Sequence, residues 1–161
     1  MKKFILSFVM ALSLLFVSNI DTQAQSALNL QAGYSWSEGN ISAGYQYKTV
    51  EIKGGWMFTK MPGDGSSVTG PVVTFVWGPE WDQSGYYLSY TYNSVGYRYQ
   101  ESYSGGSWSN NYVEGMNIIS LGYKVGTDVW YLKADVGYGW SASGRGPSYG
   151  VVLGFPLFGS Y

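Results

Sequence analysis

The sequence predicts an all-β protein, an eight-stranded antiparallel up-and-down transmembrane β-barrel that follows an N-terminal signal peptide. Segments in which apolar and polar residues alternate recur along the chain between clusters of turn residues, which is the pattern of strands with two different faces. Only 12% of the residues are charged whereas 19% are aromatic, a composition that suits contact with lipid better than contact with water. After the first 24 residues, no segment shows the period of about 3.6 residues that indicates an amphipathic helix.

The first 24 residues have the pattern of a secretory signal peptide. Two lysines precede an apolar run from Phe4 to Val17, and the small residues Thr22 and Ala24 mark a cleavage site. The apolar run is shorter than the roughly 20 residues that a membrane-spanning helix needs. We therefore expect residues 1–24 to be removed and residues 25–161 to form a single barrel domain.

Four strands are expected in the first half of that domain, at residues 26–37, 41–48, 50–58 and 71–78. A two-residue hairpin at positions 49 and 50 would pair Lys48 with Glu51 on one face. The next pair on the same face would be Gln46 with Lys53.

Four further strands are expected at residues 86–93, 117–125, 128–143 and 148–155. Between the first two of them, the alternation slips near Gly96 and residues 97–112 show no clean pattern, which predicts a long hairpin tip with a bulge. A turn at Gly126 would give a register that pairs Lys133 with Ser120. Connections alternate between short ones and the longer segments 59–70, 100–111 and 141–147, as in barrels that cross an outer membrane.

The distribution of side chains over the two strand faces predicts a polar interior and an exterior that contacts lipid. The apolar face carries no charge, and its aromatic residues fall near the strand ends, where the two interfaces of a bilayer would lie. Eight strands enclose a space that only small or polar side chains would fill without crowding. The expected network of polar lumen residues is Lys48, Glu51, Lys53, Lys124, Lys133 and Asp135. The expected aromatic girdle is Trp36, Trp56, Trp77, Trp130, Tyr138 and Trp140.

With these features the chain resembles the small eight-stranded outer-membrane barrels of the OmpX and OmpA type. The segment from Ser148 to Phe155 is similar to the C-terminal assembly signal of that family, and Pro156–Tyr161 extends past it. The resemblance implies that Gly150, Leu153 and Phe155 are read by the barrel-assembly machinery. It also implies that the protein lies in the outer membrane of a Gram-negative bacterium, in contact with outer-membrane lipid.

Several kinds of chemistry are excluded by composition. The chain has neither histidine nor cysteine, so it offers no Ser-His-Asp triad, no thiol nucleophile and no histidine metal site. We therefore expect no enzymatic activity, no cofactor and no metal, and the net charge of −1 gives no reason to expect a nucleic-acid partner. The loop aromatics interleaved with Ser, Gly and Asn are candidates for contact with a sugar or protein partner, or for packing against one another: Tyr99, Tyr103, Trp108 and Tyr112.

Three classes of function remain open on this reading. The first is an integral outer-membrane barrel with a structural or surface-contact role through its outer loops, its lumen plugged by polar side chains. Inward glycines such as Gly122 and Gly154 remove filling, however, and favour a narrow channel for small solutes as the alternative. The second class is a secreted, lipocalin-like soluble barrel that binds an apolar ligand on its aromatic face. The third class, ranked last, is an enzyme that acts on envelope lipid. It would need a serine and a carboxylate that work without histidine.

Overall fold

The computed structural model describes residues 26–35, 38–60, 67–102 and 109–160, with side chains over 26–34, 39–60, 67–95 and 113–158. Eight strands fill most of these ranges, in agreement with the expected number. They are β1 (Ser26–Ser35), β2 (Glu38–Tyr47), β3 (Val50–Lys60), β4 (Ser67–Trp77), β5 (Gly85–Ser102), β6 (Ser109–Gly126), β7 (Tyr131–Trp140) and β8 (Arg145–Ser160). The expected signal peptide lies outside the described residues. Within the described ranges, no helix is both long enough and apolar enough to cross a membrane.

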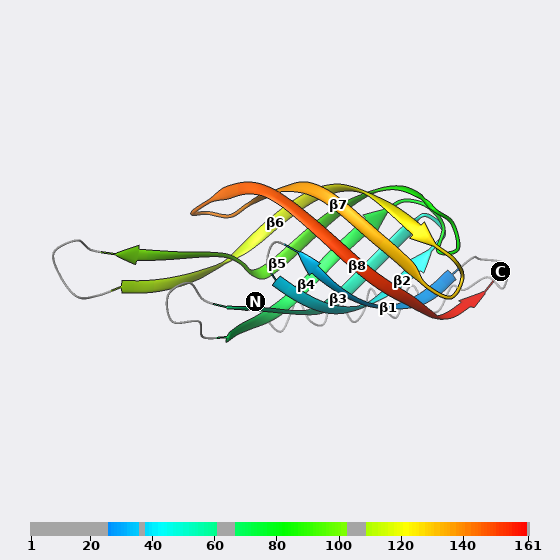
Figure 1. Cartoon of the computed structure of the whole chain (residues 1–161), viewed down its shortest axis with the longest axis horizontal. Coiled ribbons are helices and arrows are strands. Elements are labelled where there is room, and N and C mark those ends of the chain that lie inside the picture. The colour runs from blue at the N-terminus through cyan, green and yellow to red at the C-terminus, as the bar shows by residue number, and fades with distance from the viewer. Residues whose placement is uncertain (1–25, 36–37, 61–66, 103–108, 161) are drawn as a thin grey trace, which may run out of the picture.

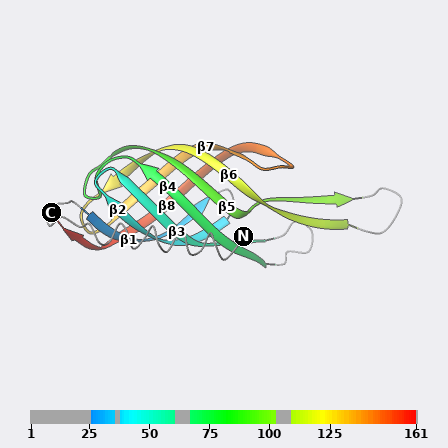
Figure 2. The same cartoon turned by 180° about the vertical axis from the view of Figure 1, so that it is seen from behind.

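The strands form a closed antiparallel barrel in which each strand pairs with its neighbours in chain order (Figure 1). The barrel closes where β1 pairs with β8, from Ser26 opposite Ser160 to Ser35 opposite Gly150. From one end of the barrel, β5 and β6 continue outward as a two-stranded ribbon, which both views show (Figures 1 and 2). We call this the ribbon end. The turn between β2 and β3, the segment between β4 and β5 and the end of β8 lie at the opposite end, which we call the closed end.

Two expected registers are wrong by an even number of residues. Lys48 and Thr49 form the turn between β2 and β3, so Glu51 pairs with Gln46 and not with Lys48. The connection between β6 and β7 is longer than expected, and Lys133 pairs with Lys124 instead of Ser120. Because side chains alternate with a period of two, an even slip keeps each side chain that remains in a strand on its predicted face.

Three hairpins extend further than the alternation indicated, whereas β7 is shorter than the strand expected at 128–143. β3 and β4 pair as far as Lys60 opposite Ser67, into the loop expected at 59–70. β5 and β6 reach Ser102 and Ser109, and the register shifts between Asn93 and Tyr97, so the expected bulge is present. β8 starts at Arg145 and continues past Phe155 to pair with the start of β1. The connection between β7 and β8 is consequently shorter than the expected loop at 141–147.

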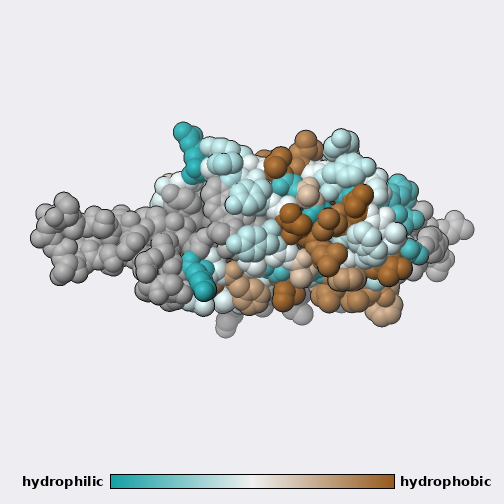
Figure 3. All heavy atoms as spheres, in the orientation of Figure 1, coloured by the Kyte–Doolittle hydropathy of each residue, from teal (hydrophilic) through white to brown (hydrophobic). Residues whose placement is uncertain are grey.

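The two faces of the barrel differ as the alternation predicts. Large apolar side chains point outward, for example Leu121 on β6 and Leu132 on β7, and hydrophobic side chains gather over the barrel surface in Figure 3. Polar side chains point inward and are buried, for example Ser120 beside Leu121 and Lys133 beside Leu132. The interior of this fold is therefore mostly polar, with a few buried apolar side chains such as Met57, Val72 and Ile118.

Candidate functional site

The centre of the lumen is occupied by an ion pair between Glu51 of β3 and Lys133 of β7. Their side-chain Oε2 and Nζ atoms are 2.5 Å apart, and the residues are 1% and 3% exposed. The other carboxylate oxygen of Glu51 accepts hydrogen bonds from Asn29 Nδ2 at 2.9 Å and Gln31 Nε2 at 2.6 Å. Three strands thus converge on one carboxylate, which has a partner for each oxygen. This satisfies the condition under which a buried charge is tolerated.

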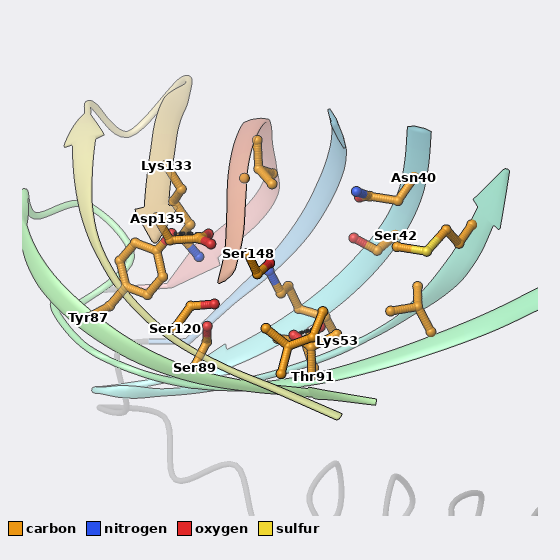
Figure 4. A pocket seen from close by; sticks show the side chains of 16 residues that line it. Asn40, Ser42, Lys53, Tyr87, Ser89, Thr91, Ser120, Lys133, Asp135 and Ser148 are labelled. Carbon is orange, nitrogen blue, oxygen red and sulfur yellow. Dashed lines mark hydrogen bonds between the residues drawn. The ribbon is translucent and has the colours of Figure 1, made fainter. Parts of the chain in front are cut away.

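A second set of polar groups lies on the ribbon-end side of this pair (Figure 4). The hydroxyl of Tyr87 donates to Asp135 Oδ2 at 2.9 Å, and Lys53 Nζ donates to Gln31 Oε1 at 3.2 Å. The ammonium of Lys133 lies 5.6 Å from the centre of the Tyr87 ring and 5.0 Å from that of Tyr131, within range of cation–π attraction. Positive and negative groups therefore alternate across the lumen.

Inward glycines are matched by large side chains on the neighbouring strands. Tyr131 pairs with Gly154 and Tyr87 pairs with Gly122. A Cβ atom added at either glycine would overlap the tyrosine ring that covers it. The space that these glycines free is therefore occupied, and Tyr131 is 0% exposed.

At the closed end, the segment 78–84 between β4 and β5 folds over the lumen. Lys124 Nζ donates to the carbonyl oxygens of Glu80, at 2.9 Å, and Trp81, and lies 5.0 Å from the centre of the Tyr131 ring. The side chain of Trp81 is buried at 3% exposure. Gln46 Nε2 donates to Pro79 O at 2.8 Å and holds the other side of the segment.

This closure is not predicted by the sequence pattern, because GPEWDQSG has the composition of an ordinary surface turn. One signal was present in the sequence: a large aromatic residue, Trp81, in the middle of a turn. A second was Lys124, an inward lysine next to a strand end. Together these residues indicate a turn that packs inward, because a tryptophan ring is stabilised by burial and an inward lysine can then donate to the backbone carbonyls that the packed turn removes from water.

Two separate cavities remain in the described part of the lumen. The larger, of about 70 Å³, lies on the ribbon-end side and is lined by Lys53, Asp135 and several Ser and Thr hydroxyls. The smaller, of about 10 Å³, lies beside Lys124 at the closed end. Tyr87 and Lys133 line both cavities and so lie between them. The larger cavity has room for a few water molecules and the smaller for about one.

The structure places five of the six expected lumen residues inside the barrel and corrects the sixth. Glu51, Lys124 and Lys133 are buried, and Lys53 and Asp135 line the larger cavity. Lys48 instead lies exposed in the turn after β2, with its ammonium 5.6 Å from the centre of the Tyr47 ring. Its φ of 51° explains the error, because an alternating strand cannot continue through a left-handed residue.

Most of the other expected site residues within the barrel lie on its outer face. Trp56, Trp77, Trp130, Tyr138 and Trp140 are exposed, with Trp130 in the connection before β7. Leu153 and Phe155 of β8 also point outward, whereas Gly150 faces the Asp135 carboxylate. Tyr99 and Tyr112 are paired in the ribbon. Trp36, Tyr103 and Trp108 lie outside the described residues.

The polar interior bears on the alternatives left open by the sequence. A lipocalin-like barrel would enclose its apolar ligand, whereas here most large apolar side chains point outward and the centre of the described lumen is filled by Gln31, Glu51, Lys124, Lys133 and other polar groups. This arrangement argues against that alternative. Across the described ranges, no group of three or more Asp, Glu, His or Cys residues is placed to hold a metal ion.

No protein-family model matches the chain, and no curated protein matches it. A solved structure that it resembles is the N-terminal β-barrel domain of OprF from Pseudomonas aeruginosa, with a TM-score of 0.58 and 14% sequence identity. The match covers 84% of this chain and 100% of the OprF domain chain. This similarity confirms the expected fold, a small closed eight-stranded antiparallel barrel.

Proposed function

We propose that this protein is an integral outer-membrane barrel of a Gram-negative bacterium, that its lumen is plugged, and that its β5–β6 ribbon makes surface contacts. The observation that carries the proposal is that polar side chains are buried and apolar ones exposed, the reverse of the distribution in soluble proteins. The polar network of Glu51 and Lys133 is buried, while more than half of the Leu121 and Val136 side-chain surfaces is exposed. In water such an exterior would be an aggregation hazard, and in lipid it is the stable arrangement.

The positions of the exposed charges support a barrel that spans a membrane. Lys48 and Asp128 lie in connections at the closed end, and Lys60 and Arg145 lie at strand ends on the ribbon side. Between these two levels, the described outward side chains carry no charge. A charge near the middle of a bilayer costs about 2–4 kcal/mol, so lipid accounts for the uncharged band between the two ends.

A plugged lumen is supported by three successive layers across it. From the closed end, these are the folded segment with Trp81, the ring of Tyr131, and the Glu51–Lys133 pair with Tyr87. Each charged member has a hydrogen-bonded or ring partner, so displacing it leaves another buried group unsatisfied. A steady pore of porin size would require all three layers to move.

The ribbon supports a role in surface contact. β4 pairs with β5 only as far as Asn93, and β7 pairs with β6 only from Asn117, so both outer edges of the ribbon carry unpaired backbone groups. An extended segment of a partner can add a strand to such an edge through main-chain hydrogen bonds. The surface partner of this proposal is therefore a protein segment that binds as an added strand, and Tyr99 and Tyr112 lie within the part of the ribbon that it would meet.

Assembly by the barrel-assembly machinery belongs to the same proposal. Leu153 and Phe155 lie on the outer face of β8, where the assembly machinery would contact them, and Phe158 is exposed further along the strand. An enzymatic role has no support, because the lumen polar groups are committed to one another and the chain lacks histidine and cysteine.

Fractionation tests the central proposal. The protein should sediment with the outer membrane, resist extraction by carbonate or high salt, and require detergent for release. On gels, the unheated protein should migrate differently from the heated protein, as folded barrels do in detergent. Recovery in a soluble periplasmic or extracellular fraction without detergent would contradict the proposal.

A further inference from the structure

A groove runs along the outer face of the barrel between β4 and β5, away from the lumen. Its volume is about 270 Å³, and its walls are the outward side chains Val50, Phe75, Trp77, Leu88, Tyr90 and Ile119. Val76 and Ser89, which pair across the two strands, lie at its base. The groove begins at the closed end, at Trp77, and reaches the middle of the barrel at Ile119.

The topology explains why a groove forms at this position. β4 and β5 are paired only from Val72 opposite Asn93 to Trp77 opposite Leu88, whereas β3 and β4 are paired along their whole length. Beyond Trp77, the segment 78–84 turns inward to cover the lumen, and none of its side chains lines the groove.

We propose that this groove binds one acyl chain of a phospholipid, with the lipid phosphate at Lys48. The inference rests on the proposed function, because the groove is continuous with the outer surface that we place in lipid. Its walls present six apolar or aromatic side chains and almost no polar surface, which suits a hydrocarbon chain better than a polypeptide backbone that needs hydrogen-bond partners.

Lys48 supplies the charge at the end of the groove. Val50 pairs with Trp77, and Gly78 N donates to Thr49 O at 2.9 Å, so the turn that contains Lys48 is fixed beside the groove entrance. The Lys48 ammonium lies over the ring of Tyr47 on β2, 5.6 Å from its centre, and is not itself part of the groove lining. An exposed cation beside an apolar groove matches the phosphate and chain of one lipid.

The backbone at Lys48 is a second reason to assign it a role. Its φ of 51° is a conformation that Gly and Asn adopt at little cost in two-residue hairpins, so the turn conformation itself does not favour lysine. The charge that lysine brings to this position is therefore a candidate reason for its presence there.

Native mass spectrometry tests the proposal. The protein is inserted into vesicles of phosphatidylcholine and phosphatidylglycerol, insertion is verified by heat-modifiable migration, and the protein is extracted into mild detergent. We expect one retained phospholipid per barrel, with phosphatidylglycerol enriched at least threefold over its share of the vesicle. Leu88→Trp fills the groove and should reduce retention at least fivefold. Leu153→Trp is the matched control, since Leu153 has similar exposure on β8 but lies outside the groove lining.

Further variants test the groove and the phosphate site separately. Ile119→Trp fills the groove from β6 and replaces Leu88→Trp if that variant does not fold. Lys48→Gln should remove the preference for phosphatidylglycerol while one lipid is still retained, and an unchanged preference would overturn the phosphate assignment. Equal retention by the groove-filling and control variants would overturn the groove. Failure of the wild-type protein to insert would instead contradict the proposed function.

Discussion

The ring of Tyr131 on β7 lies over Gly154 on β8, its direct partner in the strand pairing. The tyrosine is fully buried, and a side chain at position 154 would occupy the space of its ring. The same arrangement recurs where Tyr87 covers Gly122. The glycines of the inner face therefore let a narrow barrel hold two large rings, and the lumen is filled by a few large side chains in addition to many small ones.

Replacing Gly154 should destabilise the barrel. Gly154→Val forces the Tyr131 ring from its place, and overpacking of this kind costs about 1–3 kcal/mol. The free energy of unfolding can be measured from urea titrations of the protein in vesicles. Gly54→Ala is the control, because Gly54 faces outward with no atom within 4 Å of an added Cβ, and its effect should stay within about 0.5 kcal/mol. Equal effects of the two substitutions would contradict the packing described here.

Breaking the central ion pair should be more costly. Glu51→Gln leaves the buried ammonium of Lys133 without its counter-charge, and the loss of one partner of a buried pair costs about 3–5 kcal/mol. The double substitution Glu51→Gln with Lys133→Met removes both charges and should recover part of that loss. A double-mutant cycle on unfolding free energies measures the coupling. A coupling near zero would show that the two side chains do not depend on each other.

Arginine on the outer face discriminates lipid from water. Leu121→Arg and Val136→Arg should each reduce the amount of folded barrel in the outer membrane, because these paired residues point outward near the middle of β6 and β7 in the barrel, and a charge at the bilayer centre costs about 2–4 kcal/mol. On a water-exposed surface the same changes would cost within about 0.5 kcal/mol. Ser120→Ala on the inner face should be tolerated. The ratio of heat-modified to folded protein on gels gives the result, and normal amounts of both arginine variants would place this face in water.

Conductance measurements test the plugged lumen. In planar bilayers the purified protein should show no steady open conductance of porin size, because Tyr87 and the Glu51–Lys133 pair separate the two cavities. Lys133→Ala should lower stability rather than alter ion preference. Reproducible channels whose selectivity reverses when Lys53 or Lys133 is neutralised would support the narrow-channel alternative instead.

The inward-folded segment 78–84 should depend on Lys124. Lys124→Met removes the hydrogen bonds to the carbonyls of Glu80 and Trp81, and the segment should then exchange its amide hydrogens at least tenfold faster. Hydrogen exchange read by mass spectrometry resolves this peptide. Lys48→Met serves as the comparison, because it changes a lysine at the same end that donates nothing to the segment. Unchanged exchange in the Lys124 variant would show that other contacts hold the segment.

The sequence was sufficient to predict the strand number and the two faces, because both depend on a local period of two. Registers were less predictable, since a slip by two or four residues preserves the faces and only the turn conformation decides between them. The positive φ of Lys48 is the clearest example, because lysine gives no sequence signal for a left-handed turn. The closure by Trp81 was also missed, because it depends on contacts with Lys124 from a strand far along the chain.

The pairing of β1 with β8 has a kinetic consequence. Ser26 meets Ser160 only after nearly the whole chain is available, so the contact that closes the barrel has one of the largest sequence separations this chain permits. Such non-local contacts make folding slow, because loop-closure entropy must be lost before the contacts form. Until β8 arrives, β1 presents a bare edge of unpaired backbone groups that promotes aggregation. Shortening the chain after Phe155 would remove the last pairs of this seam and lengthen the time for which that edge stays open.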